Sequence, residues 1–123
     1  MIDHISVAVS DLERSRRFYT DVLATLGLSQ IVLKKTTIGF GKIYPEFWIN
    51  LRAGMAPVGE DSGLHICLRA PSKDAVEAFF DAAVKSGGSA EAEPRMWPDY
   101  NERYFATFVR DPDGNRIEAV HFV

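Results

Sequence analysis

The sequence predicts an α+β fold built from two modules that share one order of elements, strand–helix–strand–strand–strand. The first observation is a partial internal repeat: residues 4–11 read His-Ile-Ser-Val-Ala-Val-Ser-Asp and residues 65–72 read His-Ile-Cys-Leu-Arg-Ala-Pro-Ser. The second is that each copy begins with the two-residue alternation of a strand and continues into the spacing of an amphipathic helix. The third is the length of 123 residues, which suits one core. We therefore expect a single domain over 1–123 whose modules pack about a pseudo-two-fold axis.

Module one is expected over about 1–53. Residues 2–9 alternate as a strand, and Ser10 or Asp11 provides an oxygen that caps a helix over about 12–26. Gly27 is the natural end of that helix. Extended segments follow at about 29–34, 37–42 and 46–52, and a linker rich in Gly and Pro covers about 54–62.

Module two is expected over about 63–123 and repeats this order. A strand is expected over 64–69, and it is followed by a helix that begins at Ser72 or Lys73 and runs through about Ser86. Strands are expected near 89–93, 103–110 and 115–122, and the aromatic loop 94–102 is a candidate lid over a cleft. The Asp-Pro-Asp-Gly run at 111–114 predicts a tight turn before the last strand.

Composition excludes several classes of partner. A net charge of −3 provides no basic field for a polyanion, so we expect no nucleic-acid partner. No apolar run approaches the roughly 20 residues of a membrane span, and no secretory pattern opens the chain. The single cysteine, Cys67, excludes a disulfide within the chain. We expect a soluble cytoplasmic protein that binds a small molecule.

The repeat also predicts a site. It pairs His4 with His65, and the last strands of the halves pair Asn50 with Glu118 on inward faces. Two imidazoles and a carboxylate suit a divalent metal ion (Fe, Mn, Ni, Co or Zn) with open positions for substrate. The alternative is that both histidines are hydrogen-bonded strand residues and that Glu118 pairs with an arginine, Arg69 or Arg52.

Strand parity brings further side chains to the cleft. Trp48 and Phe122 either contact an apolar ligand or fill the core, and an arginine near the cleft binds a ligand anion or forms a structural ion pair. Tyr104 either polarises a bound oxygen or bonds a backbone group, and Cys67 is expected to be a small buried filler. The candidate catalytic residues are Glu118 and Tyr104. The candidate substrate-binding residues are Asn50, Trp48, Arg52, Cys67, Arg69 and Phe122.

These motifs together resemble the vicinal-oxygen-chelate superfamily, which includes glyoxalase I, extradiol dioxygenases, and the fosfomycin and bleomycin resistance proteins. The matching residues are Asp-His-Ile at 3–5 with 9–15 and Phe-Tyr at 18–19, Gly-Leu-His-Ile at 63–66, and the run from Phe108 to Glu118. The resemblance implies two βαβββ modules whose curled mixed sheets form a shared metal-lined cleft. It assigns the metal-ligand role to His4, His65 and Glu118.

The resemblance also separates the branches of that superfamily. Glyoxalase I-like members usually have a glutamate, both ligand and proton-transfer group, where this chain has Asn50, which cannot act as a general base. The remaining His, His, Glu set resembles that of the extradiol dioxygenases, which are generally larger. Two functions therefore stay open: a metal-dependent enzyme with lyase, isomerase or dioxygenase chemistry, and a metal-free ligand-binding protein of the bleomycin-resistance type.

We expect a homodimer, although the two modules of one chain can either close on each other or pair with the modules of a second chain across a two-fold axis. The site then lies either within one chain or across the interface, with His4 from one chain and His65 from the other.

Overall fold

The structure, a computed structural model, describes all 123 residues as two four-stranded mixed sheets with one helix each. The first module contains β1 (Ile5–Val9), α1 (Leu12–Ala24), β2 (Ser29–Leu33), β3 (Thr37–Gly41) and β4 (Pro45–Leu51). The second contains β5 (His65–Arg69), α2 (Lys73–Lys85), β6 (Ser89–Met96), β7 (Tyr104–Arg110) and β8 (Arg116–Phe122). The predicted fold class, α+β with two βαβββ modules, is confirmed.

Both sheets have the same strand order. The first runs β1-β4-β3-β2 and the second runs β5-β8-β7-β6. In each, the first strand of the module pairs in parallel with the last, and the other pairs are antiparallel. As a result β1 and β5 are edge strands, each with one side free of a strand neighbour within its sheet.

The element boundaries lie close to those predicted, with two differences that affect the site. His4 precedes β1 instead of lying within it. β6 runs to Met96, beyond the predicted end at 93, because Arg95 and Met96 continue to pair with Ala106 and Phe105 of β7 across a register shift. The aromatic loop is therefore shorter, 97–103.

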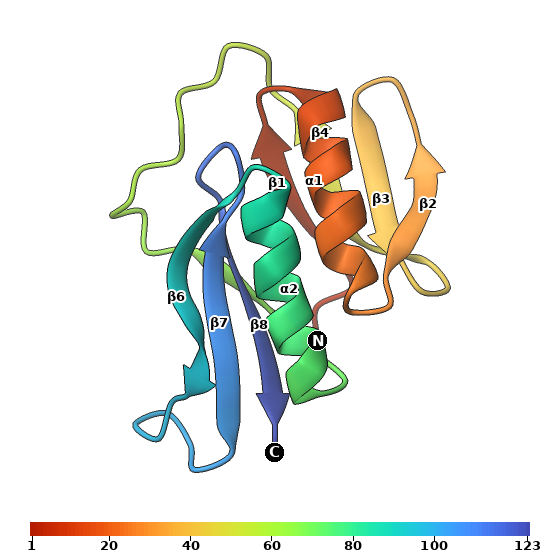
Figure 1. Cartoon of the computed structure of the whole chain (residues 1–123). Coiled ribbons are helices and arrows are strands. Elements are labelled where there is room, and N and C mark those ends of the chain that lie inside the picture. Colours follow the sequence, from red (N-terminus) through yellow and green to blue (C-terminus); the bar gives the residue numbers. More distant parts are fainter.

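The core lies between the helices and the sheets. α1 begins after Asp11, whose carboxylate accepts from the backbone N–H of Arg14, and α2 begins after the Ser72 cap. Figure 1 shows the two helices side by side on one face of the sheets, with β1 and β8 towards the middle. The fully buried side chains of the helices and the first sheet include Phe18, Tyr19, Leu23, Ile38, Phe40, Phe47, Ile49, Val76 and Phe79.

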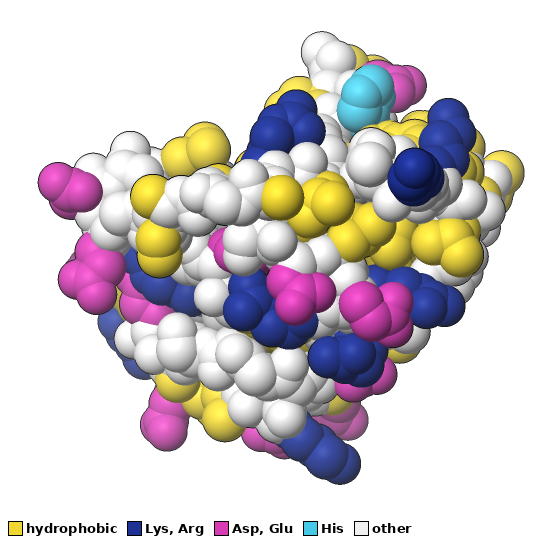
Figure 2. All heavy atoms as spheres, turned by 90° about the horizontal axis from the view of Figure 1, so that it is seen from above, with side chains coloured by type: hydrophobic (Ala, Val, Ile, Leu, Met, Phe, Trp, Pro, Cys, Tyr) yellow, Lys and Arg dark blue, Asp and Glu magenta, His cyan; other side chains and the backbone are white.

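The two helices approach closely at the end of α2. A Cβ at Gly88 would lie 2.6 Å from the ring of Phe18, so a glycine is needed where α1 packs against this end. The hydroxyl of Ser86 donates to Asp21 at 2.8 Å across the same contact. Neither helix is both long and apolar enough to span a bilayer. Figure 2 shows basic and acidic side chains interspersed over the face it displays.

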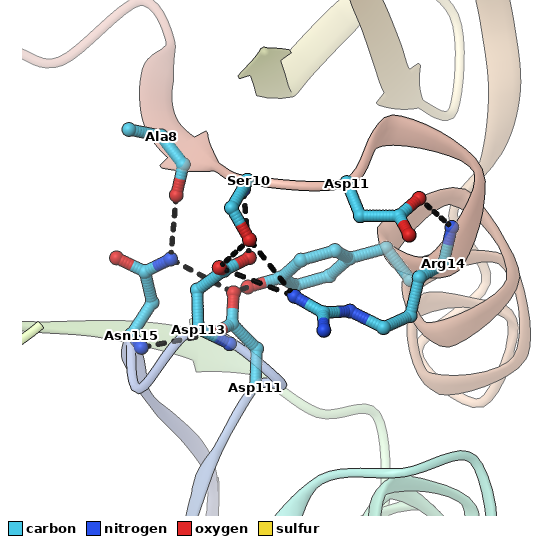
Figure 3. Close-up of polar contacts among 8 residues, drawn as sticks. Ala8, Ser10, Asp11, Arg14, Asp111, Asp113 and Asn115 are labelled. Carbon is cyan, nitrogen blue, oxygen red and sulfur yellow. Dashed lines mark hydrogen bonds and ion pairs between the residues drawn. The ribbon is translucent and has the colours of Figure 1, made fainter. Parts of the chain in front are cut away.

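The turn between β7 and β8 joins the two modules through a buried polar network (Figure 3). Asp113 is 5% exposed and accepts three hydrogen bonds from module one. They come from the backbone N–H of Ser10 at 3.1 Å, its hydroxyl at 2.5 Å, and the guanidinium of Arg14 at 3.2 Å. Asn115 adds a bond to the carbonyl of Ala8 at 2.9 Å. We call these contacts, with those of Asp111 below, the intermodule network.

Asp111 is the second carboxylate of this network. Its Oδ1 accepts from the backbone N–H groups of Asp113 and Asn115 at 2.9 and 2.8 Å, which shapes the turn. Its Oδ2 accepts from the Tyr19 hydroxyl at 2.6 Å and from the Asn115 side chain at 2.8 Å. Burial raises the pKa of Asp111, and the hydrogen bonds from Tyr19 and Asn115 oppose that rise.

Asp113→Ala removes three bonds to a buried charge and leaves Ser10 and Arg14 without their acceptor. We expect the free energy of unfolding to fall by about 3 kcal/mol. Urea unfolding measures it, with the exposed Asp61→Ala as the control, for which we expect a change within about 0.5 kcal/mol. Equal effects of the two substitutions would show that the network does not hold the modules together.

Tyr19→Phe tests the charge on Asp111. Because folding raises the pKa of this carboxyl above 3.8, folded Asp111 binds its proton more tightly than unfolded Asp111, and stability falls as pH rises from 3.8 through the folded pKa. The Tyr19 hydroxyl limits that fall. We expect the substitution to cost about 1 kcal/mol near pH 3, below the ordinary pKa of an aspartate, where the hydroxyl bonds a neutral carboxyl, and about 2 kcal/mol at a pH above the folded pKa, where it bonds a carboxylate. Urea unfolding at both pH values checks this, and a larger loss at the acid pH contradicts it.

Candidate functional site

A buried carboxylate lies at the centre of the second sheet. Glu118 is on β8, between β5 and β7, and is 2% exposed. Its Oε2 lies 3.0 Å from Nε2 of His65 on β5, and its Oε1 accepts a short hydrogen bond from the hydroxyl of Tyr104 on β7. Each oxygen thus has one polar partner, as a buried carboxylate requires.

Aromatic rings surround this carboxylate. Phe108 packs edge-on against the imidazole of His65, with ring centroids 5.7 Å apart, and Tyr104 packs edge-on against Phe122 at 5.3 Å. The register places Glu118 directly opposite Cys67 on one side and Phe108 on the other. The rings remove water from around the carboxylate and leave the His65 side chain, 37% exposed, as its polar contact with the surface.

The same environment changes the acidity of two neighbours. Burial, followed by the hydrogen bond to Glu118, raises the pKa of Tyr104, so its hydroxyl stays protonated and acts as a donor. Partial desolvation of its sulfur and the charge of Glu118 raise the pKa of Cys67 to about 12. The prediction that Cys67 is a buried filler is wrong, because the residue is exposed on the edge strand β5, with Sγ 3.8 Å from the Tyr104 hydroxyl.

The symmetric pairing of Asn50 with Glu118 is also wrong. In the first sheet Ile5 pairs with Phe47 and Ser6 with Trp48, whereas in the second Ile66 pairs with Ile117 and Cys67 with Glu118. Trp48 therefore occupies the position that corresponds to Glu118, and Asn50 lies two residues further along β4. The prediction aligned Ile49-Asn50 with Ile117-Glu118 because both are an isoleucine followed by a polar residue. Which residues of β4 and β8 are equivalent is instead set by their pairing with the parallel strands β1 and β5.

Trp48 and Asn50 have structural partners in the first sheet. A Cβ at Gly39 would lie 3.1 Å from the Trp48 ring, which therefore lies flat over this glycine. The amide of Asn50 donates to the Ser6 hydroxyl at 2.7 Å and to the Val7 carbonyl at 3.0 Å. Module one thus has no carboxylate at the position that matches Glu118.

His4 lies apart from the Glu118–His65 pair. Its Nδ1 is 2.6 Å from the carboxylate of Asp3, and its side chain is 53% exposed. No group of three or more His, Cys, Asp or Glu side chains is arranged to hold a metal ion. His4 and His65 nevertheless line one groove of about 340 Å³ between the start of module one and the free edge of β5.

That groove continues along β5 into a second one. The first is lined by His4, His65, Cys67, Leu68 and Glu46 among others. The second, of about 260 Å³, shares Leu68 and Glu46 and reaches Arg69. We call the two together the seam groove, since they run between β5 and module one.

The arginines of the candidate site lie in different places. Arg69 is exposed, with its guanidinium carbon 5.1 Å from the centre of the Phe122 ring. Arg52 is exposed beyond the end of β4 and donates to the Leu51 carbonyl. The alternative in which Glu118 pairs with one of these arginines is wrong, because its partners are His65 and Tyr104.

The aromatic loop is anchored at its first residue. The backbone N–H of Trp97 donates to the Tyr104 carbonyl at 2.8 Å, and its indole N–H donates to the Ala106 carbonyl at 3.0 Å. The indole ring stacks on Tyr100 at 5.4 Å and meets the guanidinium of Arg95 at 3.4 Å. These contacts hold the start of the loop in place beside Phe108, one of the rings around Glu118.

Comparison with known proteins identifies the family. The model of the Glyoxalase/Bleomycin resistance protein/Dioxygenase superfamily matches residues 1–119, and the chain belongs to this superfamily. It is similar to a glyoxalase/bleomycin resistance protein from Albidiferax ferrireducens T118, with 31% identity, a TM-score of 0.87 and coverage of 98% of each chain. Comparison with curated proteins found no match.

Two more distant structures share the fold. A glyoxylase/bleomycin resistance protein/dioxygenase domain from Frankia sp. EAN1pec is 20% identical, with a TM-score of 0.72 and coverage of 100% of this chain and 98% of that one. A glyoxalase I mutant from Zea mays is 21% identical, with a TM-score of 0.74, and the match covers 95% of this chain and 44% of that one.

Several residues of the site were missed from the sequence. Phe108, which packs against His65, and Glu46 and Lys42, which line the seam groove, were not among the candidates. Trp97, which packs on Phe108, was expected only as part of the candidate lid. Phe108 could have been found from the sequence, because it lies four residues after Tyr104 on β7 and therefore on the same face of the strand. Nothing local marks the groove residues, because they meet β5 only through the packing of the modules.

Gly39→Ala tests the seat of Trp48. The added Cβ would lie 2.8 Å from the Pro45 side chain as well as against the indole, so Trp48 must move. We expect a loss of about 2 kcal/mol of unfolding free energy and a changed near-UV circular dichroism signal from the indole. Gly59→Ala, which meets only the flexible carboxylate of Asp61, is the control. Unchanged stability and spectrum in Gly39→Ala would mean that Trp48 is not held there.

Proposed function

We propose that the protein is a metal-dependent small-molecule enzyme of the glyoxalase/dioxygenase type, with lyase, isomerase or dioxygenase chemistry. The observation that carries the proposal is the buried Glu118, which holds the imidazole of His65 at the wall of a groove that His4 also lines. Burying a carboxylate this deeply costs folding free energy unless the carboxylate is paired, and proteins retain such groups where they orient or polarise a neighbouring functional group.

The donor chemistry fits a divalent cation (Fe, Mn, Ni, Co or Zn). Glu118 and His65 provide adjacent oxygen and nitrogen donors, and His4 would supply the third, since it precedes β1 and is half exposed. A bound cation would polarise an oxygen of the substrate and stabilise negative charge that develops on it. With Trp48 at the position matching Glu118, module one offers no second carboxylate at that position.

The chain's own residues would bind and orient the substrate. Tyr104 keeps its proton and donates to Glu118, which fixes the carboxylate against His65. Phe122 and Trp48 would provide apolar walls for the substrate body. Asn50 has no basic group, and its amide is already engaged by β1, so proton transfer in the substrate would fall to Glu118 and not to this position.

We further propose a homodimer. Ile2 and Leu64, which lie just before β1 and β5, are 79% and 69% exposed. Large apolar side chains exposed in this way favour burial against a second copy. A second copy could bring its own His4 to the Glu118–His65 pair, which would complete the ligand set across the interface.

A second candidate is a metal-free ligand-binding protein of the bleomycin-resistance type. The observation that favours it is that both oxygens of Glu118 already have partners, Tyr104 and His65, so the carboxylate needs no cation for its hydrogen bonds. The same groove would then hold a ligand without chemistry.

Metal uptake separates the two functions. The purified protein, stripped by a chelator, is dialysed against each of Fe(II), Mn(II), Ni(II), Co(II) and Zn(II), and bound metal is measured by elemental analysis. We expect about one ion per site for at least one metal, and an affinity at least tenfold weaker in Glu118→Gln, His65→Ala and His4→Ala, because each removes a donor.

His121→Gln is the matched control, since this imidazole bonds the Ala70 carbonyl and lies away from Glu118. Uptake below about a tenth of an ion, or uptake that all three donor variants retain, would overturn the metal proposal. Sedimentation of the parent protein tests the dimer, and a monomer at micromolar concentration would contradict it.

A further inference from the structure

We propose that the seam groove selects an elongated small molecule with an anionic group at the end opposite His65; this inference rests on the proposed function of the Glu118–His65 site. The groove follows β5 from His65, at the reactive end, to Arg69. That distance covers the whole strand, roughly 13 Å at the ordinary rise per residue. A ligand that reaches both ends must therefore be extended.

The far end of the groove has an apolar floor and two cations. Leu26, Leu28, Phe47 and Leu68 form the floor. Lys42, from the turn between β3 and β4, and Arg69 stand over it. Both are exposed, and neither takes part in an ion pair of the chain.

Arg69 is held ready for a planar anion. Its guanidinium lies over the Phe122 ring at 5.1 Å, which leaves the N–H groups at its edge free to donate. Arg110 and Arg116 of the same sheet are used differently, since both pair with Glu91, at 3.1 and 2.9 Å. A carboxylate is the anion whose geometry best matches a guanidinium edge.

Glu46 fixes the direction of the ligand. It lines both parts of the groove, at the place where they meet. Its negative charge disfavours an anion at that midpoint. The anionic group is therefore placed at the Lys42–Arg69 end, and the uncharged oxygen-bearing end at His65.

Octanoate and its neutral isostere octanamide test the proposal by calorimetric titration. We expect octanoate to bind at least tenfold more tightly than octanamide, because only the carboxylate pairs with the two cations. Arg69→Gln and Lys42→Gln, from different elements, should each weaken octanoate about tenfold and leave octanamide unchanged. Glu46→Gln should strengthen octanoate. The exposed Arg17→Gln and Lys35→Gln are the matched controls.

Equal binding of the two probes, no octanoate binding by the parent, or unchanged binding in both the Arg69 and the Lys42 variants overturns the proposal. Because the two substitutions lie on separate elements, the proposal can still be tested if one of the variants fails to fold. Metal uptake by Glu118→Gln and His65→Ala is measured separately. If these variants lose metal as expected but the parent does not prefer octanoate, only this inference is contradicted. If the parent prefers octanoate but the variants bind metal as well as the parent does, only the proposed function is contradicted.

Discussion

The structure depends on two carboxylates in one turn. Asp113 binds the start of α1 through Ser10 and Arg14, and Asp111 binds Tyr19 in the middle of that helix. Both carboxylates are almost fully buried, so each needs all of its hydrogen bonds. Because these bonds cross from module two to module one, the turn fixes how the two sheets sit relative to one another. Within the family-like run, the turn at 111–114 therefore positions the site without contributing a side chain to it, whereas Glu118 at the end of the run belongs to the site.

The position of the sheets decides the shape of the candidate site. With the modules joined at this turn and along the helices, the free edge of β5 lies beside module one without pairing to it. The seam groove is the space that results. One end has His65 and the other has Arg69, so one five-residue strand carries both the imidazole and the guanidinium of the groove.

Glu118 shows how one buried charge organises its surroundings. It fixes His65 and Tyr104, and with burial it raises the pKa values of Tyr104 and Cys67. The thiol of Cys67 beside Glu118 is therefore a weak acid, and so little of it is ionised at neutral pH that it does not serve as a nucleophile. The polar group that the carboxylate presents to the groove is the imidazole of His65.

The sequence by itself determined the two modules, their element order and most boundaries, because strand alternation, helix spacing and glycine stops are local signals. It also predicted that His65, Glu118 and Tyr104 share one face, which the contacts among them confirm, since strand parity fixes which face a side chain occupies. Only the tertiary structure decided that Trp48 matches Glu118, because equivalence follows the parallel pairing between strands far apart in the chain. It alone placed His4 outside β1 and brought Lys42 and Arg69 to one groove, because the lining of that groove depends on how the modules pack.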